Sequence, residues 1–343
     1  MSSSSTLRIA LDAMGGDFAP QNEVAGAILA LRELRTSEEV VLVGDAHRIE
    51  PLIVGKTSGT YSIEHATQVI TMEDSPTAAV RQKRDSSLAV GMRLHQEGKV
   101  DAFVSAGNTG AMLSASTLIL GRVANVSRPT IGTFIPAEHG VCLLVDAGTN
   151  VDCRAQHLYE FGVMGSIYFE KIQKKKNPTV ALLNVGEEKS KGTEVVLEAF
   201  EKLSQSKLNF IGNVEGRDIL KAKADVVVCD GFVGNIVLKF GESVPGFLRS
   251  RLTDVANRSI LNKLAVGLAK SSLRKALGDL DPNVAGGVPV LGVNGVAIIG
   301  HGSSTAVGIK NMILRAAEVA RAQLNKHIEA ALAESVGASQ PVN

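Results

Sequence analysis

The centre of the fold is marked by Asp101-Ala-Phe-Val-Ser-Ala-Gly-Asn-Thr-Gly110, which continues into Ala111-Met-Leu-Ser-Ala-Ser-Thr-Leu-Ile-Leu120. The first part predicts a short buried strand that ends at Ser105, and the last part predicts a helix of small and apolar residues. Glycine lets the turn between them bend sharply and lets an anion approach the backbone. Because the helix directs unpaired N–H groups into that turn, Asn108, Thr109 and Gly110 are expected to bind phosphate.

Five further apolar strands end in small polar residues. They are Leu7–Leu11 before Asp12–Asp17, Val141–Val145 before Asp146–Asn150, Val180–Leu183 before Asn184–Thr193, Asp225–Cys229 before Asp230–Asn235, and Val296–Ile299 before Gly300–Ser304. In open α/β sheets, ligands bind outside the carboxyl ends of the strands. The simplest hypothesis is that all six turns line one shared ligand-binding cleft. The alternative for any single turn is an ordinary strand–helix connection, in which glycine serves only to let the backbone bend.

The regular alternation of strands and helices predicts the fold class. Helices are expected at 23–34, 157–168, 194–203 and 306–334. Such an alternation is typical of an α/β, three-layer αβα sandwich with a mostly parallel sheet. The 343 residues, 45% of them hydrophobic, are expected to form a single large α/β domain over 1–343, with disordered ends at 1–6 and 335–343.

Residues 242–281 interrupt this alternation, because no strand is expected there. Helices are expected at 245–254, 260–270 and 273–277. Between Leu248 and Ala276 there are seven basic residues and one acidic residue, and an apolar stripe lies at helical spacing; the stripe is Leu261, Leu264 and Leu268. The segment is interpreted as a protruding helical hairpin that packs in a dimer interface, contacts an anionic membrane surface, or does both.

A basic cluster also follows the helix start expected at Pro76. It consists of Arg81, Lys83 and Arg84. Such a cluster usually forms a solvated face, and contact with an anionic substrate is the alternative.

Composition excludes several classes of function. The formal net charge is +1, aromatic residues make up 4% and tryptophan is absent, which argues against a nucleic-acid partner. The three cysteines form no CxxC pair, and no zinc-ligand spacing occurs, so no metal site is expected. The N-terminus lacks the apolar region of a signal peptide, and no apolar run reaches the length of a spanning helix. A cytoplasmic protein that can lie on a membrane surface is expected.

Known nucleophile and nucleotide motifs are missing. There is no GxSxG elbow, and Gly186–Thr193 places its lysine wrongly for a phosphate-binding Walker loop. Gly300–Thr305 partly resembles a dinucleotide fingerprint, but no second strand follows it to present an acid to a ribose. The remaining amides, glycines, hydroxyls, lysine and histidine suit binding of an anion and stabilisation of developing negative charge. Acyl transfer to a small oxyanion fits this set.

Several motifs carry a family resemblance over most of the chain. They are Asp12–Asp17, Ser105–Gly110, Leu183–Glu188 with Lys191-Gly192, Gly212–Asp218, Val228–Asn235, and Gly292–Val296 with His301–Ser304. In these motifs the chain resembles the bacterial phosphate acyltransferases, the acyl-[acyl-carrier-protein]:phosphate acyltransferases of phospholipid synthesis. The resemblance extends from about Leu7 to the final helix, with the motifs in family order.

The resemblance implies a reaction and partners. Fatty acyl-[acyl-carrier-protein] and inorganic phosphate would give acyl phosphate and free acyl-carrier protein, and a glycerol-3-phosphate acyltransferase would use the product. It also implies a homodimer, a fold like the phosphate acetyltransferases and the isocitrate/isopropylmalate dehydrogenases, and peripheral membrane association through the helical segment at 242–281. No cofactor is implied.

The resemblance also implies catalytic residues. By motif position they are Lys191 and Asn235, with Lys189 as a nearby competitor for the lysine. From its chemistry, His301 is a candidate general acid for the leaving thiolate, and a structural turn residue is the alternative. The candidate substrate-binding and phosphate-binding residues are Gly15, Gly16, Asn108, Thr109, Gly110, Asn150, Asn184, Ser303 and Ser304.

Two other classes of function remain open from the residues. The first is an NAD-dependent dehydrogenase of a related fold, which would need a complete nucleotide fingerprint. The second is a non-catalytic, membrane-associated scaffold, which would not need six polar turns at strand ends.

Overall fold

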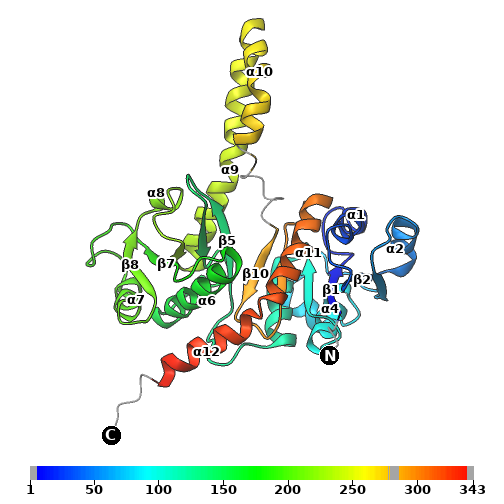
Figure 1. The fold of residues 1–343 in the computed structure, drawn as a ribbon, viewed down its shortest axis with the longest axis horizontal. Coiled ribbons are helices and arrows are strands. Elements are labelled where there is room, and N and C mark those ends of the chain that lie inside the picture. The colour runs from blue at the N-terminus through cyan, green and yellow to red at the C-terminus, as the bar shows by residue number, and fades with distance from the viewer. Residues whose placement is uncertain (1–5, 277, 279–285, 338–343) are drawn as a thin grey trace.

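One continuous sheet organises the protein. A computed structural model describes residues 6–276, 278 and 286–337 (Figure 1). Eleven strands within these residues pair in the order β3-β2-β1-β4-β11-β10-β5-β6-β9-β7-β8. Their bounds are β1 Leu7–Asp12, β2 Glu38–Gly44, β3 Tyr61–His65, β4 Ala102–Ser105, β5 Thr130–Pro136, β6 Val141–Val145, β7 Thr179–Leu183, β8 Asn209–Val214, β9 Val226–Val228, β10 Val288–Leu291 and β11 Ala297–Ile299.

Helices cover both faces of this sheet. The first-half helices are α1 Gln21–Leu31, α2 Ala46–Ile53, α3 Pro76–Gln82, α4 Ser87–Gln96 and α5 Thr109–Ala115, which continues as a π-helix over Ser116–Leu120. The others are α6 Ala155–Gln173, α7 Glu194–Ser204, α8 Gly216–Ile219, α9 Gly231–Ala256, α10 Ile260–Ala276, α11 Ala306–Arg321 and α12 Leu324–Gly337. The layered α/β architecture with a mostly parallel sheet is therefore confirmed.

The two halves of the sheet run in opposite directions. β3, β2, β1, β4 and β11 are mutually parallel, as are β6, β9, β7 and β8. Between them, β10 and β5 pair antiparallel with each other and with their outer neighbours. β5 and β10 are not predicted from the sequence, because each is a short apolar run without clear periodicity.

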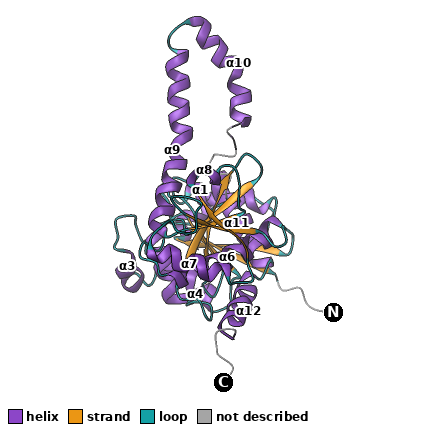
Figure 2. Ribbon diagram, turned by 90° about the vertical axis from the view of Figure 1, so that its left-hand side faces the viewer, coloured by secondary structure: helices purple, strands orange, loops and turns teal. Residues whose placement is uncertain are grey.

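Sheet twist changes the relative direction of the strands in the two halves. Adjacent strands rotate by about 20–25°, so the five steps from β11 to β7 accumulate about 100–125°. Figure 2 shows the strands turned progressively in this way. Two sets of strands that would be opposed by 180° in a flat sheet therefore point only about 55–80° apart.

The hydrophobic core fills both faces of the sheet. Strands β1 and β4 are buried on both sides, and Ile9, Leu11, Phe103 and Val104 are fully inaccessible. On one face they pack with α1 and α11, and on the other with α4 and α5. A separate cluster in the second half centres on Phe161 of α6. The strands therefore hold their carboxyl-end turns on a rigid base.

Helices α9 and α10 form a hairpin that projects from the body of the protein (Figures 1 and 2). The helix expected at 245–254 is part of α9, which begins at Gly231 with the Asp230 side chain as its cap and includes Pro245. The helices expected at 260–270 and 273–277 merge into α10, which ends at Ala276. Residues 277 and 279–281 of the expected helical segment lie outside the described residues. Among the helices within the described residues, none has an apolar stretch long enough to cross a bilayer.

The C-terminal helix differs from the expected 306–334. It divides into α11 and α12 at Gln323, whose positive φ of 47° interrupts the helix. The second part continues to Gly337, so residues 335–337, expected to be disordered, lie in α12. The remaining expected disordered residues, 1–5 and 338–343, lie outside the described residues, and Thr6 precedes β1.

Candidate functional site

The turns after β1, β4 and β11 meet at one place. The Asp12 carboxylate accepts hydrogen bonds from the Ser105 hydroxyl at 2.8 Å and from the Met14 N–H at 3.1 Å. The Ser105 hydroxyl oxygen accepts one from the Gly107 N–H at 3.0 Å. On the other side, the Asp17 N–H donates to the Gly302 carbonyl at 2.8 Å. These contacts join three of the six turns that the sequence analysis singled out.

Asn108 caps helix α5 with its side chain. Its Oδ1 accepts from the Ala111 N–H at 3.0 Å, and its Nδ2 donates to the Thr71 carbonyl at 3.0 Å. The side chain is buried. Both ends of the amide are therefore used by the fold, and the groups that remain at this helix start are the exposed Thr109 and the backbone near it.

Three glycines in these turns are required by close contacts. A Cβ at Gly15 would lie 2.4 Å from the Asp12 carboxylate, and one at Gly16 would lie 2.5 Å from Glu23 Oε1. Gly16 also has a φ of 124°, which disfavours any side chain. A Cβ at Gly110 would lie 2.7 Å from Pro76 Cγ, because the start of α3 packs there. All three lie in the turns after β1, β4 and β11, which are called the first group of turns below.

His301 and its neighbours form the turn before α11. The Ser303 N–H donates to His301 Nδ1 at 3.3 Å, and the Ser303 hydroxyl lies 2.8 Å from the same nitrogen. Because Nδ1 accepts, the neutral ring carries its proton on Nε2. The Ser304 carbonyl accepts from Asn22 at 3.0 Å. The exposed His301 ring therefore offers an N–H donor above the first group of turns.

A second group of turns follows β6 and β9. The buried Asp146 carboxylate accepts from the N–H groups of Gly148, Thr149 and Asn150 at 2.7–2.9 Å. The Asn150 side chain donates both to Asp146 at 2.7 Å and to the Pro129 carbonyl at 2.8 Å. The amide donors of Asn150 are therefore used within the fold, which assigns this residue a structural part in the turn.

Asn235 lies above this second group. Asp230 caps α9 by accepting from the Val233 N–H at 2.8 Å, which places Asn235 in the second turn of the helix. A Cβ at Gly148 would lie 3.3 Å from the Asn235 side chain, so the two residues are adjacent. Asn235 is exposed, and its amide forms no hydrogen bond with the residues that the structure describes. It can donate to a ligand.

Lys191 lies in a third group of turns, after β7 and β8. The Asn184 side chain donates to the Lys191 carbonyl at 2.9 Å, and the buried Asn213 side chain donates to the Glu188 carbonyl at 3.1 Å. The Lys191 ammonium has no partner within the described part of the chain, and the residue is exposed. Lys189, the alternative lysine, lies over the Phe200 ring at 5.6 Å. The structure therefore favours Lys191 as the lysine with a free charge.

The three groups lie on different strands of the sheet. β7 is five strands from β11, which corresponds to about 24 Å at the usual strand spacing. No hydrogen bond between the described residues joins the Lys191 loop to the His301 turn. The first two groups share a core cluster, in which Ala147 and Leu238 pack with Ala111 and Met112. One cleft common to all six turns stays a prediction.

Two buried carboxyls in the first group are not predicted from the sequence as parts of the site. They are Asp12, which accepts hydrogen bonds from the turns, and Glu23. Burial raises the pKa of Asp12 and raises the pKa of Glu23 to about 8. The position of Asp12, at the end of a strand and shortly before Gly15 and Gly16, could have indicated its role in the turn. No local sequence pattern indicates that Glu23 is buried. The described residues hold no group of three side chains suited to a metal ion.

The basic cluster after Pro76 is partly structural. The Lys83 ammonium contacts the Asp74 carboxylate at 2.5 Å and donates to the Val69 carbonyl at 3.0 Å. Arg84 Nε donates to the Arg81 carbonyl at 3.4 Å. This cluster mainly secures the segment that Asn108 contacts.

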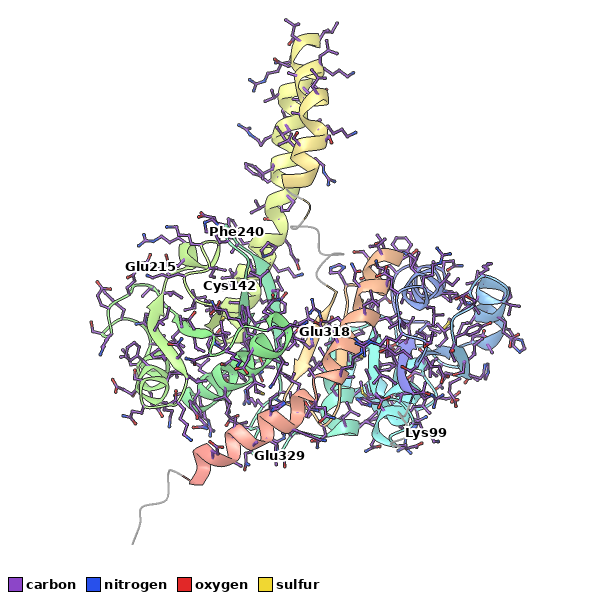
Figure 3. The ribbon with its side chains drawn as sticks, in the orientation of Figure 1. Lys99, Cys142, Glu215, Phe240, Glu318 and Glu329 are labelled. Atoms are coloured by element: carbon purple, nitrogen blue, oxygen red, sulfur yellow. The ribbon has the colours of Figure 1, made fainter. Side chains whose placement is uncertain are left out.

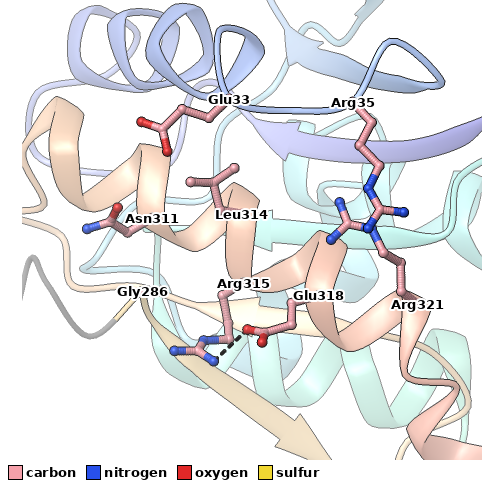
Figure 4. Close-up of a pocket in the computed structure, with 8 residues that line it drawn as sticks. All are labelled: Glu33, Arg35, Gly286, Asn311, Leu314, Arg315, Glu318 and Arg321. Atoms are coloured by element: carbon pink, nitrogen blue, oxygen red, sulfur yellow. Dashed lines mark hydrogen bonds and ion pairs between the residues drawn. The ribbon is translucent and has the colours of Figure 1, made fainter. Parts of the chain in front are cut away.

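An open pocket lies away from all these turns, between α11 and the loop after α1 (Figure 4). Its lining includes Arg35, Arg315 and Arg321. Arg315 pairs with Glu318 at 2.7 Å, and Arg321 pairs with Glu38. None of the candidate residues lies in this pocket, and two of its three arginines are already neutralised.

The fold is shared with acyl-transferring and other enzymes of known structure. A phosphotransacetylase from Streptococcus pyogenes superposes with a TM-score of 0.62 at 18% identity, covering 94% of this chain and 95% of that one. The EutD phosphotransacetylase from Staphylococcus aureus gives 0.58 at 17% identity, covering 93% and 95%. At such identities the likeness shows the fold alone, and it confirms the expected phosphate acetyltransferase-like architecture.

The amino-acid sequence is much closer to other proteins. The family described as "Fatty acid synthesis protein" matches residues 7–327. The chain is 48% identical to a phosphate acyltransferase of Heliobacterium modesticaldum, covering 98% of this chain and 100% of that one, and 46% identical to one of Moorella thermoacetica, covering 97% of each. These matches favour an enzyme over a scaffold and acyl transfer over dehydrogenation. The chain therefore belongs to the fatty acid synthesis protein family and, within it, to the phosphate acyltransferases.

Proposed function

We propose that this phosphate acyltransferase moves a fatty acyl group from the thioester of acyl-carrier protein to inorganic phosphate. The products are acyl phosphate and free acyl-carrier protein. Support comes from the names of the relatives, which specify phosphate and acyl transfer, and from a family described by fatty acid synthesis. Phosphate itself is the nucleophile in this proposal, so no nucleophilic side chain is needed.

One observation carries the assignment of roles. The fold uses the side-chain amide donors of Asn108, Asn150 and Asn184, whereas Lys191, Asn235 and His301 Nε2 keep polar groups free of partners within the described residues. Groups that act on a substrate must be available to it. We therefore assign Lys191, Asn235 and His301 to catalysis, and Asn108, Asn150 and Asn184 to holding the turns in place.

The chemistry divides among these groups. A phosphate oxygen attacks the thioester carbon, and a tetrahedral oxyanion forms that needs donors about 3 Å away. The Lys191 ammonium and the Asn235 amide supply such donors. When the intermediate collapses, the C–S bond breaks and the thiolate takes up a proton, which His301 delivers in its protonated form.

Phosphate binds in the first group of turns in this proposal. The Gly15-Gly16 turn and the start of α5 at Thr109 and Gly110 present backbone N–H groups, and Ser303 and Ser304 add hydroxyls beside His301. Attack bonds this phosphate to the thioester carbon, so in this proposal Lys191 and Asn235, in the other half, must reach the oxyanion on that same carbon.

The reaction can be tested directly. Purified protein, a defined acyl-carrier protein loaded with a fatty acid, and phosphate should release free thiol, which a thiol reagent detects. Hydroxylamine should trap the acyl phosphate as a hydroxamate. Omission of phosphate should stop both signals, and thiol release without phosphate or without hydroxamate would contradict the proposal.

The hairpin is proposed to bring the enzyme to anionic membranes from the cytoplasm. Leu261, Leu264 and Leu268 are 60–85% exposed on α10. The described basic side chains nearby are also exposed; they are Arg249, Arg251, Arg258, Lys263 and Lys270. Apolar burial and attraction to anionic lipid act together on such a surface. An amphiphilic acyl phosphate would then form close to a membrane-bound glycerol-3-phosphate acyltransferase, its proposed consumer.

A homodimer is proposed as the working state. Large apolar side chains on α9 are exposed in the single chain, with Phe240 at 72% and Phe247 at 63%. Figure 3 labels Phe240, near the base of the hairpin. Exposed apolar surface of this kind marks an interaction site. Analytical ultracentrifugation should give twice the mass of the chain, and a monomer at micromolar concentration would contradict the dimer.

A further inference from the structure

A buried carboxyl without a partner lies beneath the first group of turns. Glu23, in the first turn of α1, is 1% exposed. Its Oε2 has no hydrogen-bond partner among the described residues. A buried polar atom of this kind costs free energy, so its position calls for an explanation from function or from its protonation state.

Glu23 lies where the three turns meet. A Cβ at Gly16 would lie 2.5 Å from Glu23 Oε1, 3.5 Å from the Gly302 carbonyl oxygen and 3.6 Å from Ala106 Cβ. The Glu23 carboxyl, the Gly302 carbonyl and Ala106 therefore converge on the space beside Gly16 that a side chain would fill. A charge on Glu23 acts at short range on an anion bound where these turns meet.

The charges around Glu23 are mostly negative. Burial is the largest cause of the raised pKa of Glu23. The negative charges of Asp12 in β1 and Asp17 in the following turn raise this pKa further. Arg48 of α2 donates to the carbonyl of Ala19, four residues before Glu23, at 3.4 Å. From the β11–α11 turn, His301 is the titratable residue. With a pKa of about 8, Glu23 carries its proton at neutral pH.

We propose that Glu23 is a positioning residue of the anion site, which stays protonated while phosphate is bound and whose ionisation weakens phosphate binding. The proposal rests on the proposed function, because it places phosphate at the first group of turns. A dianion where the turns meet and a buried carboxylate beside Gly16 repel each other strongly in a medium of low dielectric constant. Binding of the anion above Glu23 is therefore coupled to its proton.

Sulfate gives the sharpest test, because it imitates phosphate but does not titrate between pH 6.5 and 9.5. Its inhibition constant against phosphate should rise at least about tenfold over this range in the unaltered protein. Glu23→Gln, which is neutral at every pH, should keep the low value throughout. Glu33→Gln, an exposed acid paired with Lys310 at 2.9 Å, is the matched control and should behave like the unaltered protein.

A second variant keeps the test informative if Glu23→Gln folds poorly. Asp17→Asn removes a carboxylate that raises the pKa of Glu23, so the rise in the sulfate inhibition constant should move to lower pH. A flat profile in the unaltered protein, an unchanged rise in Glu23→Gln, or sulfate that does not compete with phosphate would each overturn the proposal.

Calorimetry tests the role of Glu23 independently of the proposed acyl-transfer reaction. Sulfate binding at pH 8.5, measured in buffers of different ionisation enthalpy, should show uptake of a fraction of a proton in the unaltered protein and none in Glu23→Gln. Binding without proton uptake in the unaltered protein would overturn the role of Glu23 even if acyl phosphate forms. If sulfate binding is linked to proton uptake but the protein forms no acyl phosphate, the role of Glu23 is supported and the proposed reaction is wrong.

Discussion

The Asn184 side chain donates a hydrogen bond to the Lys191 carbonyl at 2.9 Å and thereby closes the loop that carries the lysine. Its Oδ1 accepts from the Val185 N–H at 2.8 Å, so the amide is engaged at both ends. Asn213 adds a further hydrogen bond, to the Glu188 carbonyl. The Lys191 side chain, in contrast, is exposed and has no partner in the described chain. The loop is thus held by its backbone and leaves the ammonium group available.

Lys191→Ala should leave the fold intact and lower kcat by about 10²–10³, because it removes a donor to the oxyanion. Lys189→Ala is the matched control: its ammonium lies over Phe200, and its loss should change kcat little. Hydroxamate formation under saturating substrates measures both. If Lys189→Ala shows the larger loss, the catalytic lysine has been misassigned.

Asn184→Ala should reduce kcat through the loop and not through direct contact with substrate. The loss should be smaller than in Lys191→Ala, about tenfold, and the double variant should be no slower than Lys191→Ala alone. Steady-state kinetics of the three variants test this. Additive effects in the double variant would show that Asn184 acts on the substrate independently.

Thr109→Val should raise the KM for phosphate several-fold with little change in kcat, because the exposed hydroxyl lies at the start of α5. Gly110→Val, although also at this helix start, should act mainly by displacing Pro76 and should lower Tm. Thr117→Val is the control, since its hydroxyl donates to the Leu113 carbonyl within the same helical segment. A raised KM for the acyl-carrier protein alone would place the acyl chain at Thr109.

His95 should make stability fall at acid pH. The ring is held neutral, with Nδ1 2.9 Å from the Val100 carbonyl and Nε2 accepting from the Val296 N–H at 2.7 Å, and burial lowers its pKa. Because the unfolded state binds the proton first, stability is full above about pH 6.5 and is lost below it, by up to about 1.4 kcal/mol per pH unit.

Urea unfolding at pH 7.5 and 5.5 measures this effect. His95→Gln should be less stable at pH 7.5, but its stability should depend less on pH between the two values. His139→Gln, at an exposed turn position, should keep the full dependence. Equal slopes in all three proteins would remove His95 as the cause.

Leu264→Glu should abolish flotation of the protein with anionic liposomes and leave acyl transfer in solution largely unchanged. Leu264 is 60% exposed on α10, so a charge there costs the folded protein little but opposes insertion into lipid. Leu220→Glu, 57% exposed on the body, is the matched control and should still bind. If Leu264→Glu dissociates the dimer in ultracentrifugation, the stripe is a subunit interface instead.

The amino-acid sequence by itself predicted the alternation of strands and helices, the polar turns after six strands and the family motifs. It could do so because these features are local: apolar periodicity, glycine at turns and helix caps act over a few neighbouring residues. Lys191 and Asn235 were predicted as catalytic residues from their positions in the family motifs, and their roles stay predictions. The strand from Val141 to Val145 was predicted with the bounds that the structure has.

Only the tertiary structure decided how the sheet reverses and which candidate side chains are free. The reversal depends on β5 and β10, whose antiparallel partners are set by pairing between distant segments. Asn108 is withdrawn from ligand contact by Thr71, 37 residues away. Glu23 is buried because the turns after β1 and β11 close over it. Burial and hydrogen bonding of this kind arise from contacts between distant segments, which no local pattern specifies.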